Sequence, residues 1–137
     1  MPKASYFVDP DSVDSMGFDW GRLTITCSPE VNGASEFSAG IVRMPPGKGH
    51  VRHNHPGAEE ILFIVSGTGE QMVEDEEGKP IVRAVGPECT VFIPAGRYHS
   101  TVNTGNTEMV VFVVYSPAGP ELAFTSLPDY RRVPASR

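Results

Sequence analysis

The sequence lacks any long run of apolar residues. None of its apolar stretches approaches the roughly 20 residues that a helix needs to cross a bilayer. The first 12 residues, MPKASYFVDPDS, also lack the apolar core of a secretory signal peptide. We therefore expect no membrane contact and a cytoplasmic location.

Cysteine and positive charge are also scarce. Cys27 and Cys89 are the 2 cysteines, and in a chain without a secretory signal two distant cysteines favour reduced thiols over a disulfide. The 11 basic and 17 acidic residues give a formal net charge of −6, and no basic run offsets it. This charge argues against a nucleic-acid partner, because a polyanion would be repelled. A small molecule is the expected ligand.

Turn-forming residues, by contrast, are abundant. The 137 residues include 14 glycines and 13 prolines. Turn signals recur about every 8–12 residues without a convincing helical period, which is typical of a β-sandwich or barrel. Strands are expected over residues 23–27, 37–44, 51–55, 60–66, 70–74, 81–85, 89–93, 100–103 and 109–115.

The length suits one domain over residues 1–137. Its core is expected over about residues 23–117. Residues 1–22 read as an extended N-terminal arm with room for one short strand, and its aromatic residues give it something to bury. Residues 118–137 read as a tail outside the core, in which a short helix over residues 121–127 is allowed.

The stretch HNHPGAEEILFIVSG, residues 53–67, holds the strongest functional signal. His53 and His55 would point in different directions on a helix. On a strand both imidazoles lie on one face, roughly 7 Å apart along the backbone. A Pro-Gly pair then breaks the strand as a turn does, and Glu60 opens the returning strand. Two imidazoles and a carboxylate at one place suit a first-row divalent metal.

A second stretch, VFIPAGRYHSTVN at residues 91–103, completes a pattern that resembles the cupin superfamily. The first cupin motif is glycine, five residues, His-x-His, three or four residues, glutamate, six residues, glycine. The second is glycine, five residues, Pro-x-Gly, two residues, histidine, three residues, asparagine. The matching residues are Gly47, His53, His55, Glu60 and Gly67, followed by Pro94, Gly96, His99 and Asn103. Glu88 replaces the first glycine of the second motif, so an altered turn is expected there. The resemblance covers roughly residues 36–117.

The resemblance implies an all-β double-stranded β-helix, a small jelly-roll barrel with an open mouth. It also implies that one divalent transition metal (Mn, Fe, Ni, Co or Zn) is bound by His53, His55, Glu60 and His99, with one or two coordination positions left open. Glu59 competes with Glu60 as the carboxylate ligand, although the spacing to the following motif glycine favours Glu60. The alternative is that the histidines are ordinary core or surface residues satisfied by hydrogen bonds.

Further residues could shape a reaction at this site. His50 lies near the mouth and could act as acid or base, although it has the opposite strand parity to His53. Tyr98, next to His99, could donate a hydrogen bond, with outward packing as the alternative. Arg43 could anchor a carboxylate or phosphate bidentately, with an exposed strand end as the alternative. The expected apolar residues of the lumen are Phe37, Ile41, Leu62, Phe92 and Val111.

Three functions fit this pattern. The favoured one is an isomerase or lyase that uses its metal as a Lewis acid on a small oxygenated substrate, such as a sugar acid or keto acid. A cupin dioxygenase of the iron type has the same ligand set. A non-enzymatic module that binds a small ligand through its metal is the third. The resemblance also implies a homodimer.

Overall fold

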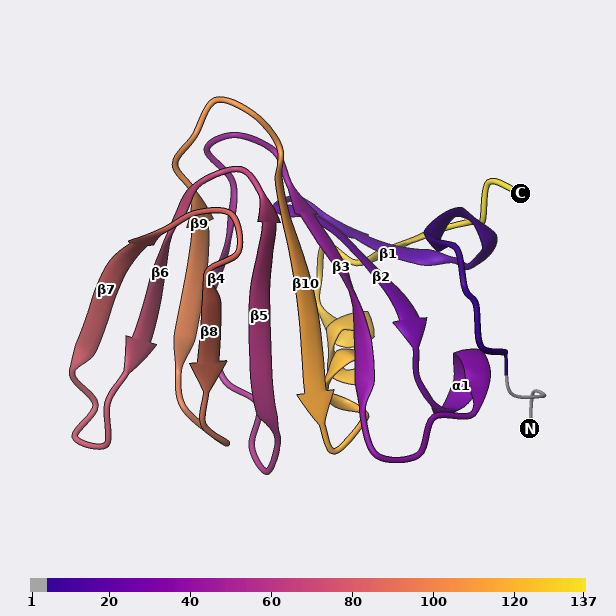
Figure 1. Ribbon diagram of the computed structural model, residues 1–137, viewed down its shortest axis with the longest axis horizontal. Helices are drawn as coiled ribbons and strands as arrows, with labels where there is room; N and C mark the ends of the chain where they lie inside the picture. Colours follow the sequence, from indigo (N-terminus) through magenta and orange to yellow (C-terminus); the bar gives the residue numbers. More distant parts are fainter. Residues whose placement is uncertain (1–4) are drawn as a thin grey trace.

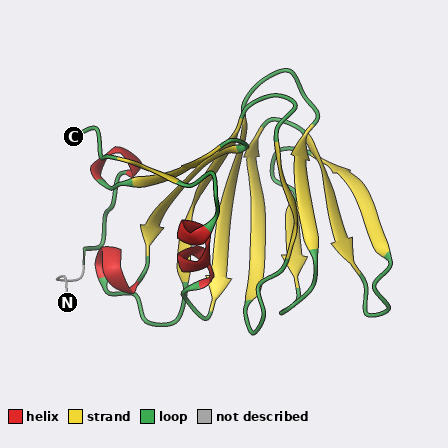
Figure 2. Ribbon diagram, turned by 180° about the vertical axis from the view of Figure 1, so that it is seen from behind, coloured by secondary structure: helices red, strands yellow, loops and turns green. Residues whose placement is uncertain are grey.

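The computed structural model describes residues 5–137, which form two antiparallel β-sheets (Figures 1 and 2). The strands are β1 (Ser15–Phe18), β2 (Gly21–Cys27), β3 (Ser38–Met44), β4 (Gly49–His53), β5 (Glu59–Ser66), β6 (Gly69–Glu74), β7 (Pro80–Val85), β8 (Thr90–Ile93), β9 (His99–Asn103), β10 (Met109–Ser116) and β11 (Arg131–Val133). The first sheet has the order β11-β1-β2-β3-β10-β5-β8, and the second has the order β4-β9-β6-β7. The expected all-β jelly-roll fold is confirmed.

Helical structure in the described part of the chain is limited to three short segments, η1 (Pro10–Ser12), α1 (Pro29–Asn32) and η2 (Pro120–Ser126). The helix allowed over residues 121–127 is thus present, as the 3-10 helix η2. Seen from behind, η2 is the helix nearest the middle strands (Figure 2). It comes from the tail of the chain and packs against the barrel.

Alternation along the strands builds the core between the two sheets. On β5, Leu62 and Ile64 are 5% and 0% exposed, whereas Ile61 and Phe63 point outward. The inward residues of β10, including Val111 at 1% exposure, lie beside them on the same face of the first sheet. Burial of each such side chain stabilises the fold by about 1.5–3 kcal/mol. The resulting packed core determines where the inward side chains of the barrel lie.

The N-terminal arm and the C-terminal tail meet in one sheet. β1 pairs with β2 through Met16 and Leu23, and on its other side with β11 through Met16 and Arg132. β1 is therefore the one short strand that was possible within the arm of residues 1–22. The first four residues of the arm expected over residues 1–22 lie outside the described residues. Arm and tail thus support each other against the barrel.

The turn before β8 carries the one departure from the second motif. Glu88 has a φ of 71°, and no other non-glycine residue between 5 and 137 has a positive φ. The N–H of Glu88 donates to the carbonyl of Ile64 at 2.8 Å, and the N–H of Cys89 donates to Gly86 at 3.0 Å. The turn that was expected to change therefore keeps a left-handed residue, the conformation that glycine adopts most easily.

Among the described residues, no helix is long and apolar enough to cross a membrane. Cys27 and Cys89 are both free thiols.

Candidate metal centre

The paired strands β4 and β9 bring histidines side by side. His50 lies opposite Thr101 and His53 lies opposite His99, with a register shift between the two pairs. A step of three residues on β4 thus matches a step of two on β9, which is the mark of a β-bulge. The bulge turns His50 onto the lumen face that His53 occupies. The expectation of opposite faces is wrong because strict alternation leaves no room for an inserted residue.

Three imidazoles converge in the lumen. His53 comes from the end of β4, His55 from the turn that follows it, and His99 from the start of β9. One ring nitrogen of each lies within 4.8 Å of the corresponding nitrogens of the other two. His55 and His99 are 7% and 2% exposed, and His53 is half-buried. The strand that was expected to continue to residue 55 ends at His53, yet both imidazoles still reach the same point.

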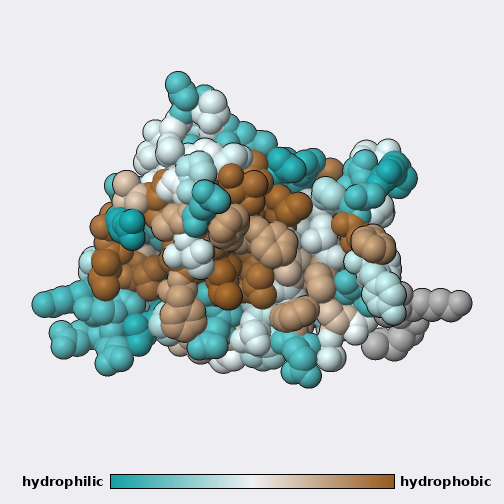
Figure 3. All heavy atoms as spheres, viewed as in Figure 1, coloured by the Kyte–Doolittle hydropathy of each residue, from teal (hydrophilic) through white to brown (hydrophobic). Residues whose placement is uncertain are grey.

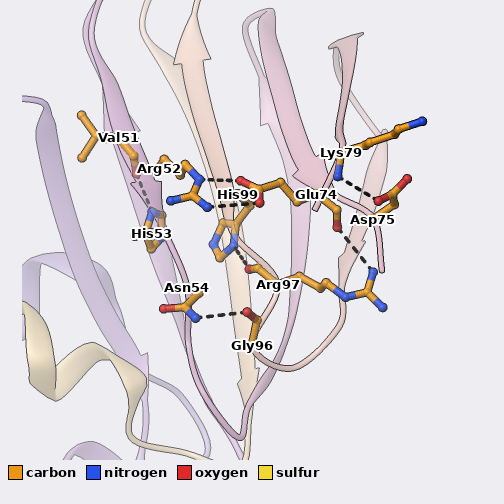
Figure 4. Close-up of polar contacts among 10 residues, drawn as sticks. All are labelled: Val51, Arg52, His53, Asn54, Glu74, Asp75, Lys79, Gly96, Arg97 and His99. Carbon is orange, nitrogen blue, oxygen red and sulfur yellow. Dashed lines mark hydrogen bonds and ion pairs between the residues drawn. The ribbon is translucent and has the colours of Figure 1, made fainter. Parts of the chain in front are cut away.

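The backbone orients two of these imidazoles (Figure 4). The Nδ1 of His53 lies 2.6 Å from the carbonyl oxygen of Val51, and the Nδ1 of His99 lies 2.9 Å from that of Arg97. A carbonyl only accepts hydrogen bonds, so each Nδ1 carries the proton and each Nε2 keeps its lone pair. Hydrogen bonds of this kind fix the tautomer and the ring orientation of metal-binding histidines.

Glu60, near the start of β5, places a carboxylate against the imidazoles. Its Oε1 lies 3.4 Å from Nε2 of His55 and 3.0 Å from Nε2 of His99. All three atoms are buried and have no hydrogen-bond partner among the described residues. Glu60 is 4% exposed whereas Glu59 is exposed, so Glu60 is the carboxylate that faces the histidines. Three unsatisfied polar atoms at one point fit a cation, which would satisfy them together.

Burial also determines the charge of these groups. Burial, assisted by the neighbouring imidazoles, lowers the pKa of His50 to about 4 and the pKa of His53 to about 2. Burial alone would raise the pKa of Glu60, but the contacts with His55 and His99 outweigh it and hold the pKa below its ordinary value. At neutral pH, His50 and His53 are therefore uncharged and Glu60 is ionised. These are the protonation states in which imidazole and carboxylate bind metals.

The site opens onto a narrow cavity inside the barrel. The centres of water molecules can occupy only about 30 Å³ of it. Its apolar walls include Leu23, Val42, Met44, Leu62, Val111 and Val113. The cavity thus combines a polar, metal-competent group of side chains with mostly apolar walls, as small-molecule sites commonly do.

Phe124 of η2 covers the site. Its ring centroid lies 5.2 Å from that of His50 and 5.8 Å from that of His55, and the side chain is 7% exposed. The segment is anchored by Glu121, whose buried carboxylate accepts a hydrogen bond of 3.2 Å from the hydroxyl of Ser38. Phe124 lines both the cavity and a wider hollow outside it. The ring therefore forms part of the partition between the lumen and the surface, together with Trp20, His50 and His53, which also line both spaces.

The expected residues of the lumen are found only in part. Leu62 and Val111 line the cavity. Phe37 precedes β3 and is 45% exposed. Phe92 is 55% exposed and pairs with the outward-facing Ile61. The expected lumen position is therefore wrong for Phe37 and Phe92.

The residues of β3 that face the lumen are not the expected ones. Val42 and Met44 line the cavity, so Ile41 and Arg43, which alternate with them, face outward. Nη1 of Arg43 lies 3.2 Å from Oε1 of Glu108 on that outer surface. The expected lumen positions of Ile41 and the proposed substrate contact of Arg43 are therefore wrong, because the apolar pair Ile41 and Val42 cannot indicate which face is buried.

Tyr98 also lies outside the lumen. It is 38% exposed, and the guanidinium of Arg52 lies 3.8 Å from its ring centroid. Arg52 is held in turn by Glu74 on the outer surface (Figure 4). Because Tyr98 precedes His99 on the chain, the alternation of the strand turns it away when His99 points inward. The outward alternative is correct, and the catalytic position expected for Tyr98 is wrong.

Trp20 and Phe124 belong to the site, although sequence reasoning did not place them there. The indole of Trp20 stacks on His50 at 4.4 Å, and His50 stacks on His53 at 3.7 Å. The aromatic residues of the arm, including this tryptophan, predicted that the segment packs against the domain or a second subunit. They did not indicate which residues it contacts. Only the pairing of β1 with β2 and β11 brings both aromatics to the mouth of the barrel.

Comparisons with known proteins agree with this geometry. The family described as "Cupin domain" matches residues 40–115. Germin-like protein 1 of Brassica napus is 30% identical over 94 residues, which are 69% of this chain and 45% of that protein. The oxalate-binding protein of Thermotoga maritima is 36% identical over 73 residues, 53% of this chain and 56% of that protein. The chain thus spans about half the length of these curated relatives. Among solved structures, KdgF from Halomonas sp. superposes with a TM-score of 0.71 at 18% identity, over 87% of this chain and 99% of that one, which shows a shared fold.

Proposed function

The chain belongs to the cupin domain family, and on that premise we propose that it is a metal-dependent enzyme acting on a small oxygenated molecule. One divalent ion is held by His53, His55, Glu60 and His99. The observation that carries the proposal is the set of three buried, unsatisfied atoms, Nε2 of His55, Nε2 of His99 and Oε1 of Glu60. A fold stabilised only by its own contacts gains nothing from leaving them unpaired.

The proposed reaction is an isomerisation or elimination on a keto acid or sugar acid. A divalent ion at this place supplies Lewis-acid polarisation of a carbonyl, which acidifies the neighbouring C–H bond. His50 lines the lumen with a neutral imidazole. In the isomerisation, we assign it the removal of that proton and its return to the adjacent atom. In the elimination, we assign it the transfer of that proton to the departing hydroxyl group, which leaves as water. The name of the oxalate-binding relative supports a small oxygenated ligand.

Metal binding is tested by titrating Ni²⁺ into the full chain and into the His53→Ala and His99→Ala variants. We expect one ion per chain in the wild type and at least tenfold weaker binding in either variant. Glu59→Ala is the matched control, because Glu59 is the exposed neighbour of Glu60 and its loss should leave binding unchanged. Wild-type affinity in both folded histidine variants would refute the assignment.

The reaction class is tested separately, because a dioxygenase or a non-catalytic binding module would use the same ligands. Candidate keto acids and sugar acids are incubated with protein loaded with Mn²⁺, Fe²⁺ or Ni²⁺, and both product formation and oxygen consumption are followed. Isomerised or dehydrated product without oxygen consumption supports the proposal. Oxygen consumption that is lost in His99→Ala would replace it with the dioxygenase.

We also propose that two copies of the chain associate through the outer face of the first sheet. Apolar side chains gather there over β5, β8 and β10 (Figure 3). This outer patch consists of Ile61, Phe63, Val65, Phe92 and Phe112, which are 36–55% exposed. We estimate its exposed area at about 400 Å², comparable to the largest patch of a typical monomer, which is often functional, and a suitable centre for an interface of about 800 Å² per partner.

Gel filtration with light scattering tests this assembly. We expect the mass of a dimer for the wild type and of a monomer for Phe92→Glu. Phe92 is the most exposed residue of the outer patch at 55%, so its replacement should leave the core intact. A monomeric wild type at tens of micromolar would refute the dimer.

A further inference from the structure

The cavity offers a ligand almost no polar contact apart from the metal site. Its polar lining consists of His50, His53, Glu60, His99, Thr101 and the phenol of Tyr115. The hydroxyl of Thr101 already donates to Oε1 of Gln71 at 2.5 Å. The remaining walls are aliphatic or aromatic. Any part of a ligand that extends away from the metal site therefore meets apolar surface.

No lysine or arginine between residues 5 and 137 lines this cavity. Three arginines on the neighbouring strands and loops are held outside it by carboxylates. Arg43 pairs with Glu108 at 3.2 Å, Arg97 lies 3.7 Å from Glu76, and Arg52 is bound by Glu74 (Figure 4). A ligand in the lumen therefore has no cationic side chain with which to pair.

The charge of the occupied site follows from these groups. A divalent ion next to the ionised carboxylate of Glu60 leaves one net positive charge. One carboxylate on the ligand neutralises that charge. A second carboxylate would be buried among largely apolar walls without a cationic partner, which is unfavourable. The lumen is thus matched to a monoanion.

We infer that the ligand of this site is a small monocarboxylate with one metal-chelating head, such as a 2-oxo acid, and an apolar tail, and that dicarboxylates are rejected. The inference rests on the proposed metal site and narrows its substrate class, because it disfavours sugar acids and oxalate. Phe124 limits the length of the tail, since its 7% exposed ring is part of the partition between the narrow lumen and the outer hollow.

A matched pair of ligands tests the inference by calorimetry on the full chain loaded with Ni²⁺. 2-Oxopentanoate and 2-oxoglutarate share the chelating head and the five-carbon chain, and differ only in a terminal methyl or carboxylate group. We expect 2-oxopentanoate to bind at least tenfold more tightly. Equal or tighter binding of 2-oxoglutarate would overturn the inference, and so would the failure of both acids to bind.

The length limit is tested with Phe124→Ala and a longer acid, 2-oxooctanoate. We expect the wild type to bind this acid at least tenfold more weakly than 2-oxopentanoate, and Phe124→Ala to reduce the difference to less than threefold. Phe124→Leu, which keeps an apolar partition, should behave like the wild type. Equal binding of the short and long acids by the wild type would contradict the role of Phe124.

Failure of this inference can be told apart from failure of the proposed function. Ni²⁺ is titrated into the same protein before any acid is added. If no ion binds, the metal site itself is wrong. If one ion binds and 2-oxoglutarate is accepted as readily as 2-oxopentanoate, the metal site stands and only the ligand class is overturned.

Discussion

Replacing Glu88 by glycine should make the protein more stable. Glu88 holds the left-handed conformation, with a φ of 71°, at the position where the second cupin motif has its first glycine. Its side chain is exposed and makes no hydrogen bond or ion pair with another described residue. Its N–H donates to Ile64 at 2.8 Å through the backbone alone, and glycine keeps that bond. The substitution therefore relieves strain without removing a contact.

The size of the effect follows from two opposing terms. An L-residue in the left-handed region costs about 1–2 kcal/mol. Glycine gives back about 0.5–1 kcal/mol, because it makes the unfolded chain more flexible. The free energy of unfolding of Glu88→Gly should thus rise by about 0.5–1 kcal/mol. With an unfolding entropy of about 2.1 cal/mol/K per residue, the Tm of this 137-residue chain should rise by about 2–3 °C.

Differential scanning calorimetry and urea unfolding measure this change, with Glu88→Ala as the control. Alanine removes the same carboxylate but keeps the strained φ, so it should have wild-type or slightly lower stability. If Glu88→Gly were no more stable than Glu88→Ala, the strain assigned to this turn would be absent and the reasoning would fail.

Three further predictions concern the site and its frame. Below pH 6.5 the metal-free protein should lose stability, on the order of 2 kcal/mol for each of His50 and His53 between pH 7 and 5. Both imidazoles protonate in the unfolded state over this range, whereas their pKa values in the folded state lie at about 4 and about 2. Urea midpoints that stay constant over this range would contradict this prediction. Ni²⁺ should quench most of the fluorescence emission of Trp20, the 1 tryptophan of the chain, because its ring is stacked 4.4 Å from that of His50. A stoichiometric Ni²⁺ titration without a fluorescence change would contradict the proposed position of the metal site. Asn103→Ala should lower the free energy of unfolding by about 2–4 kcal/mol, since the side chain is 0% exposed and makes three hydrogen bonds of 2.8–2.9 Å. Asn54→Ala, which removes one hydrogen bond of 3.1 Å, is the milder control. Equal losses of unfolding free energy in the two variants would refute the role of Asn103.

The fold and the convergence of the histidines could be predicted because both are encoded locally. His53 and His55 stand two residues apart at the end of a strand, and Glu60 follows a turn of fixed length. Such spacings determine which side chains can face one point, whatever the rest of the chain does. Most of the strands followed in the same way from the turn residues, whereas β11 and the helical segments η1 and α1 were not predicted.

The orientation of individual strands could not be predicted where apolar residues stand on both faces. On β3, Ile41 and Val42 are consecutive, so a period of two fits either parity. Phe92 on β8 is apolar yet 55% exposed, which fits the outer patch better than the core. The bulge that brings His50 beside His53 leaves no signature in the composition of β4.

Contacts between distant segments were the other part that sequence reasoning missed. Trp20 and Phe124 are separated by more than 100 positions in the sequence, and each meets His50 only after the arm and the tail have packed against the barrel. Nothing in the local pattern of either segment specifies such a meeting.

The pairing of β1 with β11 has a consequence for how the protein is made. The last strand of the first sheet, residues 131–133, leaves the ribosome when all four proposed ligands have already emerged. Until then β1 has a strand partner on one side only. The four proposed ligands therefore emerge before the first sheet can be completed.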